Sequence, residues 1–296
     1  MKAKKKYPSI KHKIRAEKER ERRIVSALFL LFVLLMCMFI GYFVYTLYFQ
    51  PSDTNRIEPD LVFYPSNPNA EVKAALIDQL ALWCPNDTFV EAVSSILTKG
   101  GFTVDYFNGK KVNVKFFKYL PTLNYKLIVL RVHSALAITE KGEKLPYVDL
   151  FTAEPYSPHK YIQEQITDQI SKCMLPNDPK TYFGISPPFI QKSMNGKFDD
   201  SIIILMGCDT LTYPSLAKAL HKKGAKAIIG WNGPVLASHT DTATTTLLKC
   251  LIIEKQTIGQ AIQNTMKEVG PDPTYNSILQ YYPDSSAQQT IESIAH

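Results

Sequence analysis

The sequence predicts an α/β domain with a mostly parallel sheet, preceded by one transmembrane helix. Apolar runs such as residues 126–132 (KLIVLRV) and 201–207 (SIIILMG) are nearly continuous, which is typical of strands that helices cover on both faces. These runs alternate with segments of helical period, and that alternation favours parallel strands joined by helical crossovers. A separate run of 26 residues without a charge, residues 24–49, is long enough to cross a bilayer as a helix.

The composition is that of a folded protein with a basic N-terminal tail. Of the 296 residues, 45% are hydrophobic and 21% are charged, which excludes a mainly disordered, collagen-like or coiled-coil chain. Residues 1–23 hold eleven Lys or Arg and three Glu, a net charge of +8, whereas the whole chain carries +7. The rest of the chain is therefore nearly neutral, and we expect no nucleic-acid partner.

The uncharged run has the features of an uncleaved signal-anchor. A cleaved signal peptide has an apolar region of roughly 7–15 residues and a small-residue cleavage site, and neither fits this run. The basic flank predicts a cytoplasmic N-terminus by the positive-inside rule. We therefore expect a single-pass protein of the cell membrane, anchored through residues 24–49, with its C-terminal domain outside the cell. The predicted organisation is a tail at 1–23, the span at 24–49, a Pro-rich linker at 50–72, a domain at 73–270 and a C-terminal extension at 271–296.

The first half of the domain has a βαβαβ pattern. Residues 73–81 (KAALIDQLA) are expected to form a strand although their helix propensity is high. Asn86 or Asp87 can cap a helix over residues 88–99, which a pair of glycines ends before a strand at 102–106. The remaining elements of this half are a short amphipathic segment at 112–120 and the strand at 126–132.

The second half begins irregularly and then becomes regular. We expect a strand at 147–153, a helix at 159–174 and an extended excursion over 181–194. The run at 201–207 is the strongest buried strand in the chain. It is followed by a helix at 214–223, a strand at 225–230 and two closing helices at about 240–254 and 257–269.

Two residues of catalytic type fall where strong strands end. His133 follows the strand at 126–132, and Cys208 follows the strand at 201–207. Ligands bind at the carboxyl ends of the strands in open parallel sheets, and a thiol beside an imidazole is the minimum for a nucleophile and its base. Gly207 permits a tight turn, and the N–H of Cys208 could help to hold an oxyanion. The alternative is that Cys208 is a small core residue and His133 is structural.

The sequence around these residues resembles the caspase-like cysteine peptidases, and within them the separases and CHAT-domain proteins. The resemblance lies in Leu205-Met206-Gly207-Cys208, in the segment 215–235 (SLAKALHKKGAKAIIGWNGPV) and in Val132-His133-Ser134. It covers roughly residues 73–270. It implies a caspase-like three-layer α/β/α sandwich, a His133/Cys208 dyad that hydrolyses peptide bonds, and an oxyanion site beside the N–H groups of Ser134 and Cys208.

Two positions depart from the pattern of that family. The family usually has Gly after the histidine and a small residue after the cysteine, whereas this chain has Ser134 and Asp209. Asp209 either raises the pKa of the thiol or points into a substrate channel, where it selects Lys or Arg. The alternative function is a catalytically inactive caspase-like domain that binds a partner at the cell surface as a scaffold module. A more distant one is a small-molecule binder that uses the same cleft.

Further residues are expected near the same cleft. Trp231, His239 and Asp241 follow the strand at 225–230, so they are candidates for substrate binding. Asp241, Ser238 or Thr240 could instead cap the next helix, and we favour the cap.

The remaining motifs point to no cofactor. The sequence has no short-spaced pair of metal ligands and no phosphate-binding glycine motif, so we expect neither a metal nor a nucleotide. The four cysteines after the span could form two disulfides, or one pair and two free thiols, and the sequence leaves both possibilities open. These four are Cys84, Cys173, Cys208 and Cys250.

Overall fold

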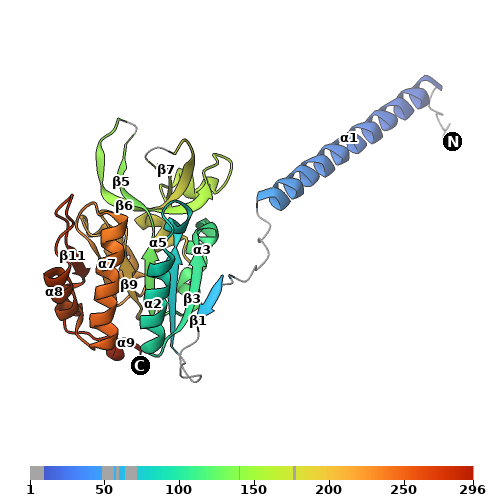
Figure 1. Cartoon of the computed structure of the whole chain (residues 1–296). Coiled ribbons are helices and arrows are strands. Elements are labelled where there is room, and N and C mark those ends of the chain that lie inside the picture. Colours follow the sequence, from blue (N-terminus) through green and yellow to red (C-terminus); the bar gives the residue numbers. More distant parts are fainter. Residues whose placement is uncertain are drawn as a thin grey trace, which may run out of the picture. The chain divides into compact units, whose positions relative to one another are not determined.

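The computed structural model describes residues 10–48, 57, 60–63, 72–139, 141–175 and 178–295. The chain divides into two compact units, Met1–Ile57 and Glu58–His296. The first unit contains helix α1 (Ile10–Tyr48), drawn in blue in Figure 1. Within α1, the stretch Glu17–Tyr45 contains an 18-residue window with a mean hydropathy of 2.9 and is long and apolar enough to cross a membrane.

A seven-stranded sheet forms the centre of the second unit. Its five inner strands are parallel, and its two edge strands are antiparallel to their neighbours. The predicted, mostly parallel sheet is therefore confirmed. From edge to edge the strands are β1 (Leu61–Phe63), β3 (Thr103–Asn108), β2 (Lys73–Asp78), β4 (Leu127–Arg131), β9 (Ile202–Leu205), β10 (Ala227–Trp231) and β11 (Leu279–Tyr282).

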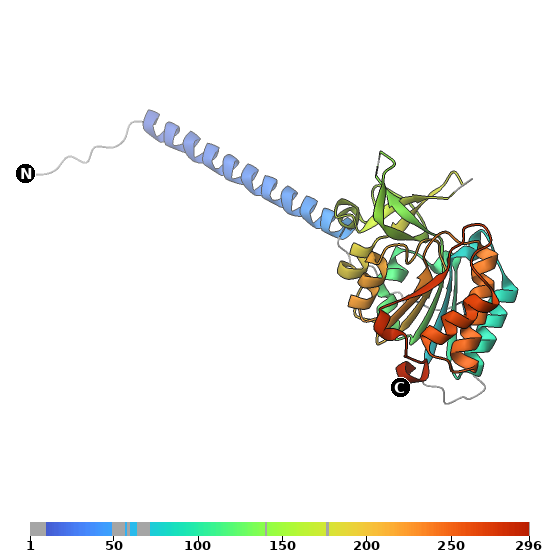
Figure 2. The same cartoon turned by 90° about the vertical axis from the view of Figure 1, so that its left-hand side faces the viewer.

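Helices cover both faces of this sheet, as Figures 1 and 2 show. Successive side chains of a strand point to opposite faces, so a strand that is buried on both faces is apolar throughout. In β2, Ala74 and Leu76 pack into the hydrophobic core on one face of the sheet. Ala75 and Ile77, which point to the other face, are equally buried. The helices of the first face are α2 (Asp87–Lys99), α7 (Ala237–Leu248) and α8 (Ile258–Glu268); those of the second are α3 (Val114–Tyr119), α5 (Pro187–Lys192) and α6 (Ser215–Lys222).

A second, smaller sheet lies between β4 and β9 in the sequence, and Figure 1 shows it beyond one end of the main sheet. All its pairings are antiparallel. We call these four strands the small sheet. In spatial order they are β5 (Ser134–Ile138), β6 (Lys144–Pro155), β8 (Thr181–Ile185) and β7 (Ile170–Met174).

The small sheet corrects two sequence predictions. The helix expected over residues 159–174 is wrong, because only α4 (Ile162–Ile166) is helical there and the final five residues form β7. The excursion over 181–194 is not extended throughout, because α5 begins at Pro187. A proline fits the first turn of a helix, where its missing N–H has no partner to lose.

The ends of the folded unit also differ from the predicted boundaries. β11 lies beyond residue 270 and pairs with β10, so the sheet includes part of the segment expected to be an extension. β1 lies within the expected linker and pairs with β3, while most of that linker is outside the described residues. β2 ends at Asp78, whose side chain accepts a hydrogen bond from the N–H of Ala81 and begins a short 3₁₀ helix, Gln79–Leu82.

Candidate active site

The pairing of β4 with β9 determines where His133 and Cys208 lie. These neighbouring parallel strands pair from Leu127 with Ile202 to Leu130 with Leu205, at a constant offset in residue number. His133 and Cys208 have the same offset, and each follows the last paired residue of its strand by three positions. The two side chains therefore leave the main sheet at neighbouring strand ends.

The two segments that leave these strands are in direct contact. The hydroxyl of Ser134 donates a hydrogen bond of 2.6 Å to the carbonyl oxygen of Cys208. A Cβ atom at Gly207 would overlap the Ser134 hydroxyl and lie 2.6 Å from the carbonyl oxygen of Val132. Glycine is therefore required at this position by the close approach of the two chains.

The Cys208 thiol is half-buried and contacts the backbone of Val235. Its sulfur donates to the Val235 carbonyl at 3.5 Å and accepts from the Val235 N–H at 3.4 Å. Burial raises the pKa of the Cys208 thiol, and the negative charges of Asp209 and Asp272 add to that effect while the Val235 N–H opposes it. The thiol is therefore protonated at neutral pH in this conformation.

The His133 imidazole is half-buried among aromatic rings. Its ring centroid lies 5.7 Å from that of Trp83 and 6.2 Å from that of Phe151, and its backbone N–H donates to the side-chain oxygen of Gln79 at 2.9 Å. Burial lowers the pKa of His133 to about 4, and the positive charge of Arg131 lowers it further. The imidazole is therefore neutral at pH 7. In the described part of the chain, no hydrogen bond joins this imidazole to the Cys208 thiol.

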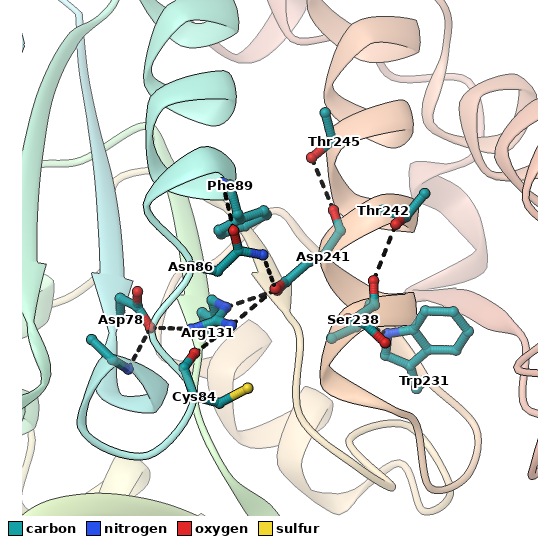
Figure 3. Close-up of polar contacts among 12 residues, drawn as sticks. Asp78, Cys84, Asn86, Phe89, Arg131, Trp231, Ser238, Asp241, Thr242 and Thr245 are labelled. Atoms are coloured by element: carbon teal, nitrogen blue, oxygen red, sulfur yellow. Dashed lines mark hydrogen bonds and ion pairs between the residues drawn. The ribbon is translucent and has the colours of Figure 1, made fainter.

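A buried ion-pair cluster is centred on Arg131, two residues before His133 (Figure 3). The Arg131 side chain is fully buried. Its Nε and Nη2 donate to Oδ1 and Oδ2 of Asp241, at 2.7 Å and 2.9 Å. Its Nη1 donates to Asp78 Oδ1 at 2.8 Å. Asn86, the N-cap of α2, donates its side-chain N–H to Asp241 Oδ2 at 2.8 Å. We call Arg131, Asp78, Asp241 and Asn86 the Arg131 cluster. It joins β2, β4, α2 and α7 at the end of the sheet where the candidate site lies.

Sequence reasoning missed this cluster, although one signal was present. Arg131 is the only charged residue of β4, and a charge in a fully covered strand requires a buried partner. The partner in α7 is 110 positions away, so no local pattern links the two residues.

The interpretation of Asp241 as a substrate-binding residue is wrong. Asp241 is 5% exposed, and both its carboxylate oxygens are occupied by Arg131. The preferred interpretation as a helix cap is also wrong. α7 begins at Ala237 with Leu236 as its N-cap, so Ser238, Thr240 and Asp241 all lie inside the helix.

Trp231 and His239 also pack inside the domain. The Trp231 side chain is fully buried, and its Nε1 donates to the Thr240 hydroxyl at 2.9 Å. A residue without exposed surface cannot contact a substrate, so that interpretation of Trp231 is wrong as well. His239 is half-buried; its Nε2 lies 3.2 Å from the Gly270 carbonyl, and its ring packs on Trp231.

Asp209 lies in the left-handed region, with φ at 59°, directly after Cys208. Its Oδ1 accepts a hydrogen bond of 2.9 Å from the Thr212 hydroxyl, and its N–H donates to the Gly233 carbonyl. These contacts hold the turn after the cysteine and leave Asp209 half-buried.

All five cysteines are free, with Cys84 exposed and both Cys173 and Cys250 buried. Neither of the disulfide arrangements that the sequence allows is present. Among the residues that the structure describes, no group of three His, Cys, Asp or Glu side chains is placed to hold a metal ion.

Comparisons with known proteins give little further guidance. No protein-family model matches the sequence, and no curated protein matches it. Among solved structures, the chain is similar to the Arg-specific cysteine proteinase gingipain R, with a TM-score of 0.42 and 13% sequence identity. The match covers 67% of this chain and 41% of that one, so the chain spans less than half of the length of this structural neighbour. At this TM-score the likeness carries no weight for function, which must be judged from the residues of the site.

Proposed function

We propose that the chain is a membrane-anchored, caspase-like cysteine endopeptidase that hydrolyses peptide bonds outside the membrane with Cys208 and His133. The observation that carries this proposal is the shared register of β4 and β9, which brings the two residues to neighbouring strand ends. The hydrogen bond from Ser134 to the Cys208 carbonyl also supports it, because that contact fixes the two segments against each other.

In the proposed reaction, the Cys208 sulfur attacks the carbonyl carbon of the peptide bond as its proton passes to His133. A protonated thiol and a neutral imidazole suit this order, because the base must be unprotonated before the attack. The imidazolium then protonates the leaving amine, and the C–N bond breaks to leave a thioester. Water attacks the thioester and gives a proton back to His133, which returns it to the departing thiolate, so that thiol and imidazole are both restored. The N–H groups of Ser134 and Cys208 are the proposed donors to the oxyanion.

The structure implies one conformational step before the attack. The Cys208 thiol contacts Val235 instead of His133, so a rotation about the Cα–Cβ bond of Cys208 has to precede proton transfer. Substrate binding is the event that would displace the Val235 contacts.

Hydrolysis of a library of internally quenched peptides by the full chain in detergent micelles tests the proposal. We expect Cys208→Ala and His133→Ala each to lower kcat/KM at least 10³-fold, roughly the loss seen when a catalytic group is removed. The matched control is Cys84→Ser, which changes an exposed thiol, keeps the Cys84 carbonyl that accepts from Arg131, and should leave the activity unchanged. Cleavage that survives in Cys208→Ala would overturn the proposal.

Asp209 has two proposed roles, and one substitution separates them. The effect of its charge on the pKa of the thiol supports an action on the sulfur. In the described part of the chain only Oδ1 of Asp209 accepts a side-chain hydrogen bond, from Thr212, which favours a role for Oδ2 in binding a cationic substrate group. If Asp209 acts on the sulfur, Asp209→Asn increases thiol reactivity and leaves the substrate preference unchanged. If it lines the substrate channel, the same variant loses a preference for basic residues at unchanged thiol reactivity.

The proposed orientation has a cytoplasmic N-terminus and an external catalytic domain. It is supported by helix α1 and by the net charge of +8 that residues 1–23 carry before its apolar stretch. Protease added to intact cells should remove the domain that begins after residue 57. If the domain is lost only after the cells are lysed, the orientation is reversed.

A second candidate function is that of a catalytically inactive binding module at the cell surface. The contacts of Cys208 with Val235 favour it, because the thiol is engaged by the backbone and its pKa is raised. An inactive module would cleave no peptide in the library, and substitution of Cys208 would not alter partner binding.

A further inference from the structure

A cavity of about 190 Å³ opens on the small sheet. Strands β5 and β7, at the two edges of that sheet, and β6 between them supply its walls. An engineered protein cavity of about 150 Å³ binds benzene, so this space is large enough for a long side chain. We call it the small-sheet cavity, and its residues used below are Ala135, Ile138, Asp149, Phe151, Ser171 and Met174.

The small-sheet cavity is lined by a buried carboxylate that forms no ion pair with any residue that the structure describes. Asp149 is 4% exposed, and its two oxygens accept hydrogen bonds of 2.7 Å from the hydroxyls of Ser171 and Ser186. Within the described part of the chain, no Lys, Arg or His side chain forms an ion pair with Asp149. Lys172 also lines the cavity, but its Nζ lies over the ring of Tyr156, 5.6 Å from the centroid.

Burial without a cation makes the charged form of Asp149 costly. Burial raises the pKa of this carboxyl, and the two serine hydroxyls offset only part of the effect. A positive group bound at the cavity would stabilise the carboxylate, because an opposite charge within about 4–6 Å favours ionisation.

The rim of the same cavity is apolar and exposed. Ile138 is 62% exposed and Met174 is 67% exposed, and both residues line the opening. An apolar rim above a buried carboxylate matches a side chain with an aliphatic stem and a cationic end. Lys and Arg have that form.

The cavity is adjacent to His133. The N–H of Phe151, which lines the cavity, donates to the His133 carbonyl at 2.9 Å, and the two rings are in contact. Ala135, another lining residue, follows His133 by two positions. In peptide hydrolysis the histidine protonates the leaving amine, so the side of the cleft that holds the imidazole is the leaving-group side.

We propose that the small-sheet cavity binds a Lys or Arg side chain of the substrate, from a residue C-terminal to the cleaved bond, with Asp149 as its counter-charge. This inference rests on the proposed peptidase function for the position of the side chain relative to the cleaved bond. Recognition of the side chain itself depends only on the cavity and on Asp149. Asp149 is thus a specificity residue, and it takes no part in bond cleavage.

The first test compares cleavage by the full chain and by Asp149→Asn. The peptides differ only in having Lys, Arg, Gln or norleucine on the leaving-group side. We expect a preference of at least tenfold for Lys or Arg in the natural sequence and a loss of that preference in Asp149→Asn. The matched control is Asp105→Asn, which changes another buried carboxylate, bound to Tyr125 and Lys73 in the main sheet. An unchanged preference in Asp149→Asn, or no preference in the natural sequence, would overturn the inference.

The second test needs no cleavage and so separates this inference from the proposed function. In a Cys208→Ala background, fluorescence anisotropy gives the dissociation constants of two labelled peptides, one with Lys and one with norleucine. We expect the Lys peptide to bind at least tenfold more tightly and Asp149→Asn to remove the difference. Equal binding of the two peptides would overturn the inference even if the chain cleaves peptides. A difference that depends on Asp149 would sustain cation recognition by the cavity even if no peptide is cleaved.

A substitution at the rim gives an independent check if Asp149→Asn fails to fold. Met174→Arg introduces a cation at an exposed position beside the cavity, where it competes with the substrate for Asp149. We expect it to weaken binding of the Lys peptide about tenfold and to leave the norleucine peptide unaffected. Equal weakening of both peptides would show a steric effect and would count against the role of Asp149.

Discussion

Two buried aspartates, one in the Arg131 cluster and one in the small-sheet cavity, differ in the charge of the groups that their carboxylates contact. Asp241 and Asp149 are 5% and 4% exposed. Asp241 accepts two hydrogen bonds from Arg131, whereas Asp149 accepts its two from serine hydroxyls and lines the small-sheet cavity. A buried charge that is already paired serves the fold. A buried charge beside a cavity, without a cation, has the features of a binding group.

The same contrast separates the regions on either side of His133. Before it, the Arg131 cluster ties four elements of the main sheet and its helices together with short ion pairs. After it, the chain enters β5 and the small sheet, whose cavity and rim are open to solvent. The candidate site therefore lies between a rigid support and an open surface.

Loss of the Arg131 cation should have the largest effect. We expect Arg131→Met to lower the free energy of unfolding by about 3–5 kcal/mol, because it leaves two carboxylates buried without their counter-charge. Denaturant unfolding of the full chain in micelles measures this. The control is Lys126→Met, which breaks a partly exposed pair with Asp199 and should cost less than about 1 kcal/mol. Equal losses in the two variants would contradict the structural role of the cluster.

The two aspartates themselves should respond differently to the same substitution. Asp241→Asn should lower the free energy of unfolding by about 1.5–3 kcal/mol, because hydrogen bonds to a charged guanidinium are lost. Asp149→Asn should change it by less than about 1 kcal/mol, because an amide can still bond to both serines and an uncompensated charge is removed. If Asp149→Asn is the more damaging of the two, the contrast between the paired and the unpaired carboxylate fails.

A further effect should appear in the dependence of stability on pH. The pKa of His133 is about 4 in the folded chain and about 6.5 when unfolded, so the unfolded state binds more protons between these values. The contribution of His133 to stability should therefore rise as the pH increases from about 4 to 6.5 and stay constant above that range. The melting temperature of the natural sequence should therefore rise, relative to that of His133→Gln, as the pH increases over this interval. Parallel curves would show that His133 is not buried as described.

The sequence predicts the main sheet well because its evidence is local. β4, β9 and β10 are covered on both faces, so their apolar runs are visible without knowledge of their neighbours. The small sheet was missed in part because β7 is half exposed, and its alternating residues also fit a helix. The separation of His133 and Cys208 can be read from the sequence. Only the pairing of β4 with β9 shows that this separation equals the register of the two strands, so that the two residues lie at neighbouring strand ends.

The Arg131 cluster and the small-sheet cavity could not be predicted in the same way. Asp241 looked like a cleft or cap residue because its partner lies 110 positions earlier in the chain. The role proposed for Asp149 depends on its having no ion pair with any described residue. The sequence does not show which side chains lie near Asp149 in the folded chain, so this feature has no local pattern.

The reaction of Cys208 with a thiol-reactive peptide probe is the most direct test of the proposed nucleophile. A Cys84→Ser background removes the exposed thiol of Cys84, which would otherwise react, and peptide mapping then locates the label. We predict that Cys208 is labelled in the full chain, that Cys208→Ala abolishes the label, and that His133→Ala slows labelling at least 100-fold at neutral pH. Labelling of Cys208 at the same rate with and without His133, or no labelling until the protein is unfolded, would contradict the account.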